Sequence, residues 1–391
     1  MVRIVLAFAL SACLAASVAA QPVQVAPLAA PDSFSVPGRP TGLAETLWQG
    51  SSVELQRTVL PMLAAKPLSP AAAALARRVL ATGARGPDGA EDPALLALRA
   101  NALLALGDSL AAAEILQRAP GLERNADLSR AAAESALLAG DDTRACAIER
   151  ALGVGREAAY WLRLRAFCQA QAGETAQAQL TYDLAQAQAR DAVFGRLMAA
   201  GLGAGAAGEP SLRNGLDYAL SRSLGLDLSR APASPVSAGA REPEFNLASL
   251  SGGVAELAQA IAGGQAMSEE GASALIAAAA EADAKSRARL QGQALLIAAL
   301  KPRLTPDDRR RLAAFAAPEG KAPAARNLAV EDAAGRKLPG ETALIALWTA
   351  ADAGAAGPAL ADRVRIVHAL AEAGLETDAR AFALEGLATL K

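Results

Sequence analysis

The amino-acid sequence predicts an all-α protein, and three observations carry this prediction. Hydrophobic residues make up 52% of the 391 residues, so the chain can bury a sizeable core. The apolar excess is mostly alanine and leucine, while aromatic residues amount to only 3%. These compositions favour helices that pack closely through small side chains. The third observation is a 33-residue repeat with the pattern of helical hairpins.

The first twenty residues have the organisation of a secretory signal peptide. A basic start at Arg3 precedes an apolar run from Ile4, and small residues fill positions 18–20. A retained membrane helix is disfavoured because the stretch is short for a span and no basic stop follows it. We therefore expect a periplasmic protein without a transmembrane helix in the mature chain. As an alternative, "LSAC" resembles a bacterial lipobox, which implies a lipid anchor at Cys13.

Charge argues against a nucleic-acid partner. The formal net charge is −2, and loss of Arg3 with residues 1–20 leaves 37 basic against 40 acidic residues, or −3. Residues 21–40 are rich in proline and small side chains, which predicts an extended tether before the first helix.

The repeat occupies about residues 92–188. "GDSLAA" begins at Gly107, "GDDTRA" at Gly140 and "GETAQA" at Gly173. An alanine precedes each glycine by seven residues and another follows it by five, at Ala100, Ala112, Ala133, Ala145, Ala166 and Ala178. Glycine accommodates a left-handed helix end, the acidic residue caps the next helix, and alanine lets two helix axes approach closely. Each copy is therefore predicted to be a helical hairpin.

This spacing resembles the tetratricopeptide repeat (TPR), although leucine, alanine or polar residues replace most of the bulky aromatic positions of that family. The resemblance implies a degenerate, right-handed solenoid of helical hairpins over residues 41–228. It also implies a peptide-binding groove on the first helix of each pair, at Asn101, Arg130, Glu134, Tyr160, Arg163 and Phe167. Arg130 and Arg163 would then face an acidic peptide from one concave wall, or alternatively serve as ordinary solvated charges.

A break in the pattern marks the predicted domain boundary. Residues 229–246 are rich in proline, serine and glycine, which predicts a linker. Residues 247–391 return to helical patterns, with a well-formed helix start at Thr305 followed by Pro306. We expect a second helical array or bundle there.

Ser109 lies in a Gly-Asp-Ser-Leu sequence that resembles the name-giving motif of the GDSL serine esterases. That family also needs a Gly-x-Asn-Asp block and an Asp-x-x-His pair to activate the serine. The chain has one histidine, His368, with Arg365 three residues before it, and no Gly-x-Asn-Asp block. We therefore interpret Ser109 as a helix-start residue and predict no catalytic site.

Two cysteines remain beyond the N-terminal segment. Cys146 and Cys168 flank the predicted turn at residues 153–157 almost symmetrically, so antiparallel helices would bring their side chains level. We predict a disulfide, with two buried unpaired thiols as the alternative. One histidine and scattered carboxylates do not suggest a metal site, and no cofactor is predicted.

The sequence thus predicts an exported, non-catalytic scaffold or adaptor that binds a protein or peptide partner in the cell envelope. A repeat surface supplies contact area without any reacting group. Two alternatives remain open: a structural lipoprotein tethered to the envelope at Cys13, and an esterase that uses Ser109.

Overall fold

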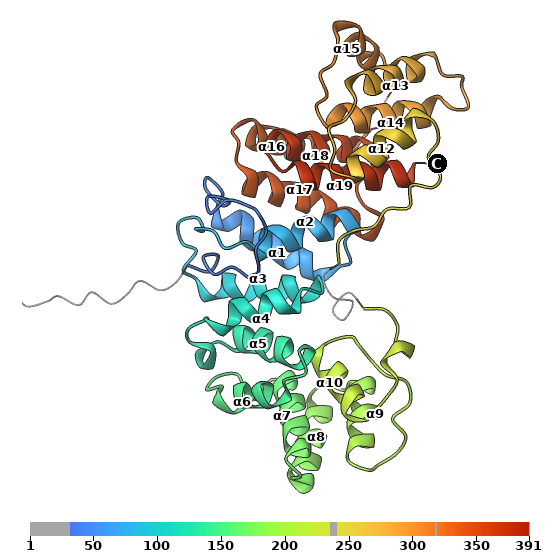
Figure 1. Ribbon diagram of the computed structural model, residues 1–391. Helices are drawn as coiled ribbons and strands as arrows, with labels where there is room; N and C mark the ends of the chain where they lie inside the picture. Colours follow the sequence, from blue (N-terminus) through green and yellow to red (C-terminus); the bar gives the residue numbers. More distant parts are fainter. Residues whose placement is uncertain (1–31, 235–240, 317–318, 391) are drawn as a thin grey trace, which may run out of the picture. The chain divides into compact units, whose positions relative to one another are not determined.

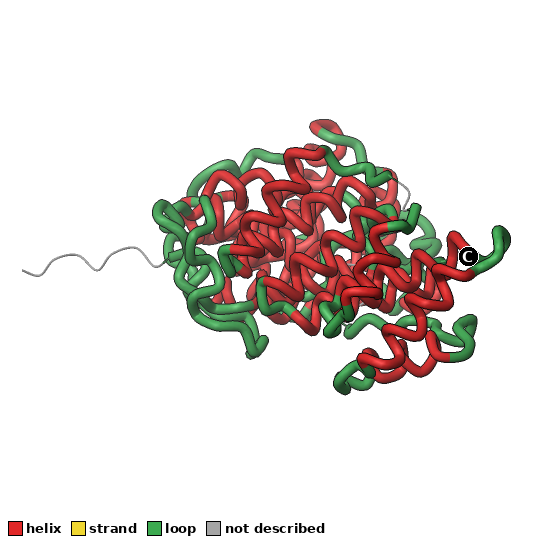
Figure 2. Tube along the Cα trace, turned by 90° about the horizontal axis from the view of Figure 1, so that it is seen from above, coloured by secondary structure: helices red, strands yellow, loops and turns green. Residues whose placement is uncertain are grey.

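The computed structural model describes residues 32–234, 241–316 and 319–390 (Figure 1). Every regular element in these ranges is helical, with eighteen α-helices, three short 3-10 helices and no strand (Figure 2). The predicted all-α class is therefore confirmed. The predicted signal peptide at residues 1–20, its Cys13, and residues 21–31 lie outside the described residues.

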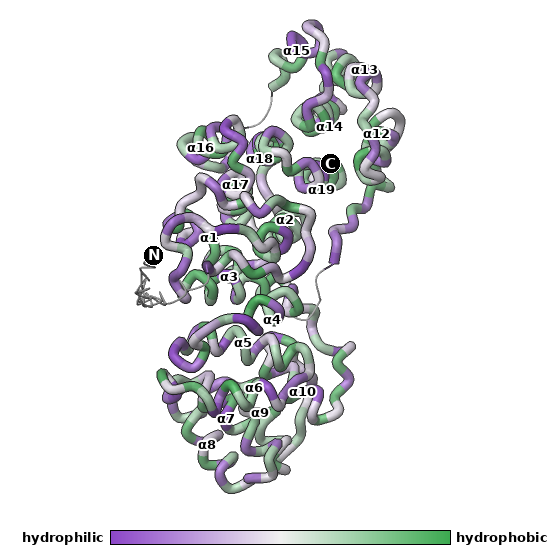
Figure 3. Tube along the Cα trace, turned by 60° about the vertical axis from the view of Figure 1, so that its left-hand side comes forward, coloured by the Kyte–Doolittle hydropathy of each residue, from purple (hydrophilic) through white to green (hydrophobic). Residues whose placement is uncertain are grey.

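Each of the first ten helices, except the first, contacts the helix that follows or precedes it in the chain. They are α1 (Val53–Ala65), α2 (Pro70–Ala81), α3 (Pro93–Ala105), α4 (Ser109–Gln117), α5 (Ala126–Leu138), α6 (Asp142–Ala151), α7 (Ala159–Gln171), α8 (Thr175–Gln188), α9 (Ala192–Gly201) and α10 (Gly215–Ser223). Helix α3 packs on α1 and α5, and α4 packs on both α3 and α5. Most helices carry both hydrophobic and hydrophilic residues (Figure 3), so one face of each is available for packing.

The same turn joins α3 to α4, α5 to α6 and α7 to α8. Gly107, Gly140 and Gly173 adopt φ values of +80°, +81° and +78°. After each glycine, the next N–H donates to a carbonyl five residues earlier, which completes a Schellman turn. The alanines that flank these turns are all fully buried: Ala100, Ala112, Ala133, Ala145, Ala166 and Ala178. Their small side chains let the paired helices approach closely.

The C-terminal helices pack beside the beginning of the chain. They are α12 (Gly253–Ala262), α13 (Glu269–Glu281), α14 (Arg287–Ala299), α15 (Pro306–Ala313), α16 (Ala324–Gly335), α17 (Pro339–Ala353), α18 (Leu360–Glu372) and α19 (Glu376–Thr389). Helix α17 contacts α1 and α2, and α19 contacts α2 (Figure 1). One main core therefore contains residues from both sides of the predicted linker, such as Leu75 of α2 and Phe382 of α19.

Residues 32–40, which the sequence analysis assigned to the tether, pack against the folded helices. We call this segment the strap. Arg99 of α3 holds it: the Arg99 side chain is 0% exposed and lies over the Phe34 ring, 5.4 Å from its centroid. The guanidinium donates hydrogen bonds of 2.7–3.0 Å to four backbone carbonyls, those of Ser33, Val36, Leu80 and Thr82. Burial lowers the pKa of Arg99 to about 9, so it is still a cation at neutral pH.

A second core forms around α5, α7, α9 and α10. It contains large aromatic side chains, among them Trp161, Phe167 and Phe194. Helix α10 packs on both α9 and α5. In the part of the chain that the structure describes, no helix combines the length and apolarity needed to cross a membrane.

Candidate functional site

Cys146 of α6 and Cys168 of α7 form a disulfide, as the sequence predicted. Their Cα atoms are 5.6 Å apart and both side chains are buried. The bond joins two successive helical hairpins at the edge of the second core.

Three of the six residues predicted to line an inner-face groove come together. The Arg130 guanidinium lies 4.6 Å from the centroid of the Tyr160 ring. Burial raises the pKa of the nearby Glu134 carboxyl, while the Gly215 N–H, the Tyr160 hydroxyl and the Arg130 charge act in the opposite direction. Asn101, the fourth residue of the predicted groove, lies on α3 and is half-buried.

The other two predicted groove residues are engaged within the chain. Arg163 donates a 2.6 Å hydrogen bond to the Ala189 carbonyl at the end of α8, and its guanidinium lies 3.6 Å from the Asp191 carboxylate. Phe167 is 1% exposed and belongs to the second core. Both side chains therefore hold α7 against its neighbours.

Helix α10 covers the face of α5 that carries Glu134. The Gly215 N–H at the start of α10 donates to Glu134 Oε2 at 2.5 Å. A Cβ atom added to Gly215 would lie 2.7 Å from the Glu134 carbonyl oxygen, so only glycine allows this approach. At the other end of α10, Arg222 donates to Asp142 of α6 at 2.6 Å. Peptide binding to the predicted face stays a prediction, and part of that face is occupied by α10.

Ser109 and His368 lie on separate helices. Ser109 is the first residue of α4, directly after Asp108, whose carboxylate accepts from the Ala111 N–H and caps the helix. His368 lies on α18, whose packing partners are α14, α16, α17 and α19. Figure 1 separates α4 from α18. The structure therefore does not bring Ser109 and His368 together.

Within the described ranges, no group of three or more histidine, cysteine, aspartate or glutamate side chains is placed to hold a metal ion.

A groove between α4 and α6 was not predicted from the sequence. Its volume is about 760 Å³, its floor is the C-terminal part of α5, and one side is the Pro37–Pro40 part of the strap. We call it the α4–α6 groove. The side chains that line it from the helices include Leu110, Ala113 and Glu114 of α4, Ala136 and Ala139 of α5, and Arg144 of α6.

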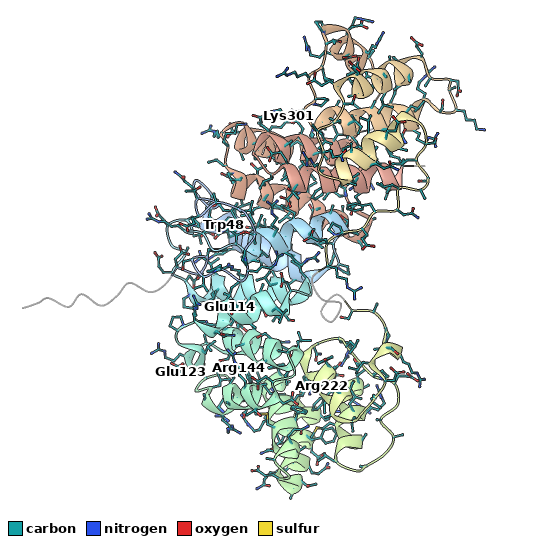
Figure 4. The ribbon with its side chains drawn as sticks, in the orientation of Figure 1. Trp48, Glu114, Glu123, Arg144, Arg222 and Lys301 are labelled. Atoms are coloured by element: carbon teal, nitrogen blue, oxygen red, sulfur yellow. A yellow bond between two sulfur atoms is a disulfide. The ribbon has the colours of Figure 1, made fainter. Side chains whose placement is uncertain are left out.

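The α4–α6 groove has an apolar floor and charged walls. Leu110 is 76% exposed, and the neighbouring floor is mostly alanine. Glu114 and Arg144 come from the two helices that flank α5 (Figure 4). Arg39 of the strap is paired with Asp108 at 3.2 Å, whereas Arg144 makes no ion pair with any described residue. The groove can therefore bury apolar side chains and still offer Arg144 to an anionic group.

The sequence contained one signal for this groove. Leu110 occupies the position that holds Thr143 and Ala176 in the next two copies of the repeat. A large apolar residue at a position that is otherwise small or polar indicates an exposed hydrophobic contact.

Searches against protein-family models, curated proteins and solved structures find no match to this chain.

Proposed function

We propose that the protein is an exported, non-catalytic scaffold or adaptor that holds a segment of a protein partner in the α4–α6 groove. The observation that carries this proposal is the exposure of Leu110 above an apolar floor. An exposed large hydrophobic side chain in a concave, mostly apolar site is a common feature of binding surfaces. A volume of about 760 Å³ lies within the range of known binding pockets and accommodates several side chains.

The proposed scaffold is a degenerate, TPR-like array of helical hairpins. Support comes from the 33-residue spacing, from the shared left-handed turn at Gly107, Gly140 and Gly173, and from the buried alanines beside each turn. Such arrays present an extended surface on a rigid set of helices. The α4–α6 groove lies between the second helices of two successive hairpins and over the first helix of the latter.

Export to an oxidising compartment is supported by two features. Residues 1–20 have the pattern of a signal peptide, and disulfides such as Cys146–Cys168 persist outside the reducing cytosol. A lipid anchor at Cys13 would keep the same binding surface at a membrane.

A non-catalytic role is supported by the separation of Ser109 from His368. Ser109 takes part in the start of α4, and His368 belongs to a different group of helices. We therefore expect Ser109→Ala to bind the partner like the native chain. Neither protein should hydrolyse a generic ester.

Site-specific cross-linking tests the proposed groove. A photo-reactive phenylalanine analogue at position 110 should cross-link a partner in intact envelopes, and mass spectrometry identifies both the partner and its contacting segment. The purified partner is then titrated calorimetrically with native chain, Leu110→Glu and Leu328→Glu. Leu328 is the matched control because it is a leucine on α16 with a similar exposure of 69%.

We expect Leu110→Glu to weaken binding at least tenfold, because it places a charge where the partner's apolar side chains are buried. Leu328→Glu should bind like the native chain. Equal affinity of all three proteins would rule out the α4–α6 groove as the binding site.

A further inference from the structure

The strap shows what kind of segment the start of α4 holds. Arg39 of the strap donates from Nε to the Asp108 carboxylate at 3.2 Å. The next contact is close, because a Cβ atom added to Gly38 would lie 2.7 Å from the Ala111 Cβ. The strap is non-helical here, and prolines stand on both sides of Gly38 and Arg39. The start of α4 is therefore covered by a proline- and glycine-containing segment that carries an arginine.

The 33-residue repeat places the same surface one hairpin further along the chain. Asp141 and Arg144, at the start of α6, occupy the positions that Asp108 and Ala111 occupy at the start of α4. Each aspartate caps its helix by accepting from the N–H three residues later, at 2.9 Å for Asp141 and 3.2 Å for Asp108. Asp141 and Arg144 line the α4–α6 groove, and the strap forms another side of it. The groove is thus the next place in the array for a segment like the strap.

The polar groups at the start of α6 are available to such a segment. Asp141 is exposed and pairs with no basic side chain of the described residues, since Arg222 pairs with the adjacent Asp142. Arg144 is likewise without an ion pair in that part of the chain. A guanidinium donates readily to the free carbonyls of a non-helical backbone, as Arg99 does to two carbonyls of the strap.

A basic residue close to a second arginine has a precedent under the strap. Burial lowers the pKa of Arg77 of α2, while the Asp108 charge opposes this shift and the Arg39 charge adds to it, so the three groups are neighbours. Arg77 donates to the Leu106 carbonyl at 3.3 Å. One arginine therefore takes the carboxylate and the other takes a backbone carbonyl.

We propose that the α4–α6 groove holds a non-helical partner segment in which an arginine or lysine stands next to proline or glycine, as in the strap. The basic side chain pairs with Asp141, Arg144 donates to backbone carbonyls of the segment, and apolar side chains of the segment cover Leu110. Because this assignment states the chemistry of the segment held in the groove, it rests on the proposed function.

A random dodecapeptide library displayed on phage tests the proposal on the full mature chain. Peptides are selected on the native chain after depletion on Leu110→Glu, so that ligands of the α4–α6 groove are kept. We expect the enriched peptides to share an arginine or lysine next to proline or glycine. Enriched amphipathic helical sequences without a basic residue would overturn the proposal and leave the proposed function standing. Absence of any peptide that depends on Leu110 would overturn both.

A double-mutant cycle tests the pairing with Asp141. The enriched peptide, and its variant with glutamine in place of the basic residue, are titrated against the native chain and Asp141→Asn by fluorescence anisotropy. Asparagine still caps α6, so this change removes only the charge. We expect glutamine to weaken binding to the native chain about threefold and to leave binding to Asp141→Asn unchanged. An equal weakening with both chains would overturn the pairing.

Glu174→Gln is the matched control for this cycle. Glu174 follows Asp141 by one 33-residue repeat, is exposed at the start of α8, and lies outside the groove. This variant should distinguish the two peptides as the native chain does.

Two further measurements test the backbone of the bound segment. Arg144→Met should weaken binding of both peptides about fivefold, because the carbonyls of the segment lose a charged donor. Proline at central peptide positions breaks a helix, yet at least one such peptide should bind within about twofold of the parent. An unchanged affinity in Arg144→Met, or loss of binding with proline at every central position, would overturn the proposal.

Discussion

The two larger cores of this protein are stabilised in different ways. The main core joins α1–α5 to α12–α14 and α17–α19 almost entirely through leucine, valine, isoleucine and alanine side chains. The second core, around α7, α9 and α10, is smaller and depends on the aromatic residues Trp161, Phe167 and Phe194. It also contains the disulfide between Cys146 and Cys168. A small apolar core supplies less free energy, so covalent and polar links take a larger share.

Buried polar links occur in both cores, and in the second core they lie around α10. The Asp217 carboxylate, which is almost fully buried, accepts from Arg213 Nε at 2.6 Å and from Ser211 Oγ at 2.8 Å. Arg213 also pairs with Asp191 at 2.9 Å, which ties α10 to the start of α9. In the main core, by contrast, Arg99 satisfies backbone carbonyls and has no carboxylate hydrogen-bond partner among the described residues. The main core contains charge pairs as well, because Arg363 of α18 pairs with Glu385 of α19 and Arg78 of α2 pairs with Asp378 of α19. The second core differs in its disulfide and its aromatic packing.

The largest expected effect is loss of Arg99, the buried cation that holds the strap. Arg99→Met removes the four hydrogen bonds that hold the strap and leaves the carbonyls of Ser33, Val36, Leu80 and Thr82 without that donor. We expect the free energy of unfolding to fall by about 4 kcal/mol, measured by urea denaturation. Arg85→Met, at an exposed arginine in the neighbouring loop, is the control and should cost less than about 0.5 kcal/mol. A similar small loss for both variants would refute the role of Arg99.

The second largest effect should be confined to the second core. Replacing both Cys146 and Cys168 by alanine removes a covalent link between residues that are 22 positions apart in sequence. Loop-closure entropy predicts a loss of about 3 kcal/mol. Hydrogen exchange should then accelerate in α6–α8 while α1 and α2 keep their protection. Equal acceleration in all of these helices would show that the two cores unfold as one unit.

The main core should respond to pH through Asp378. This residue of α19 pairs with Arg78 of α2 at 2.5 Å, yet burial raises the pKa of Asp378 from 3.8 to about 6. The folded state therefore binds the proton more tightly than the unfolded state. The stabilisation from protonated Asp378 is fully present below about pH 4 and is lost as the pH rises to about 6. It amounts to about 3 kcal/mol of unfolding free energy.

Urea denaturation of native chain and Asp378→Asn across this pH range measures that contribution. The difference in unfolding free energy between the two proteins should change between pH 4 and 6 and stay constant above pH 6. Asp88→Asn, at an exposed loop carboxylate, is the control and should parallel the native chain. A constant difference for Asp378→Asn would contradict the raised pKa.

The smallest effect should be equal near both cores. Gly173 follows α7 and Gly374 follows α18, with φ values of +78° and +85°, and an added Cβ would meet no atom within 4 Å at either site. Alanine at each position should therefore lower the free energy of unfolding only by the cost of a left-handed backbone, about 1 kcal/mol. Thermal or urea unfolding should give matching losses for the two variants. A much larger loss at one of them would indicate a tertiary constraint beyond the turn.

Local features of this protein were predictable from the residues alone. The all-α class, the hairpin turns at Gly107, Gly140 and Gly173, and the capping box at Thr305 all depend on side chains within a few positions of one another. The disulfide was predictable because its two cysteines lie on either side of one turn. The candidate site was predictable only in part, since the exposed Leu110 stands out in the repeat but the strap beside it does not.

Contacts between distant segments were not predictable in this way. Nothing in the sequence around Gly215 indicates that α10 covers the Glu134 face of α5, and Arg99 resembles any other helix arginine until the strap is placed over it. The position of α17 and α19 beside α1 and α2 was likewise not predictable from the sequence. Helix periodicity and capping act within one or two turns, so the sequence alone specifies the helices and their ends. Which faces meet depends on how whole helices match in shape and charge across hundreds of residues, and that match appears only in the folded chain.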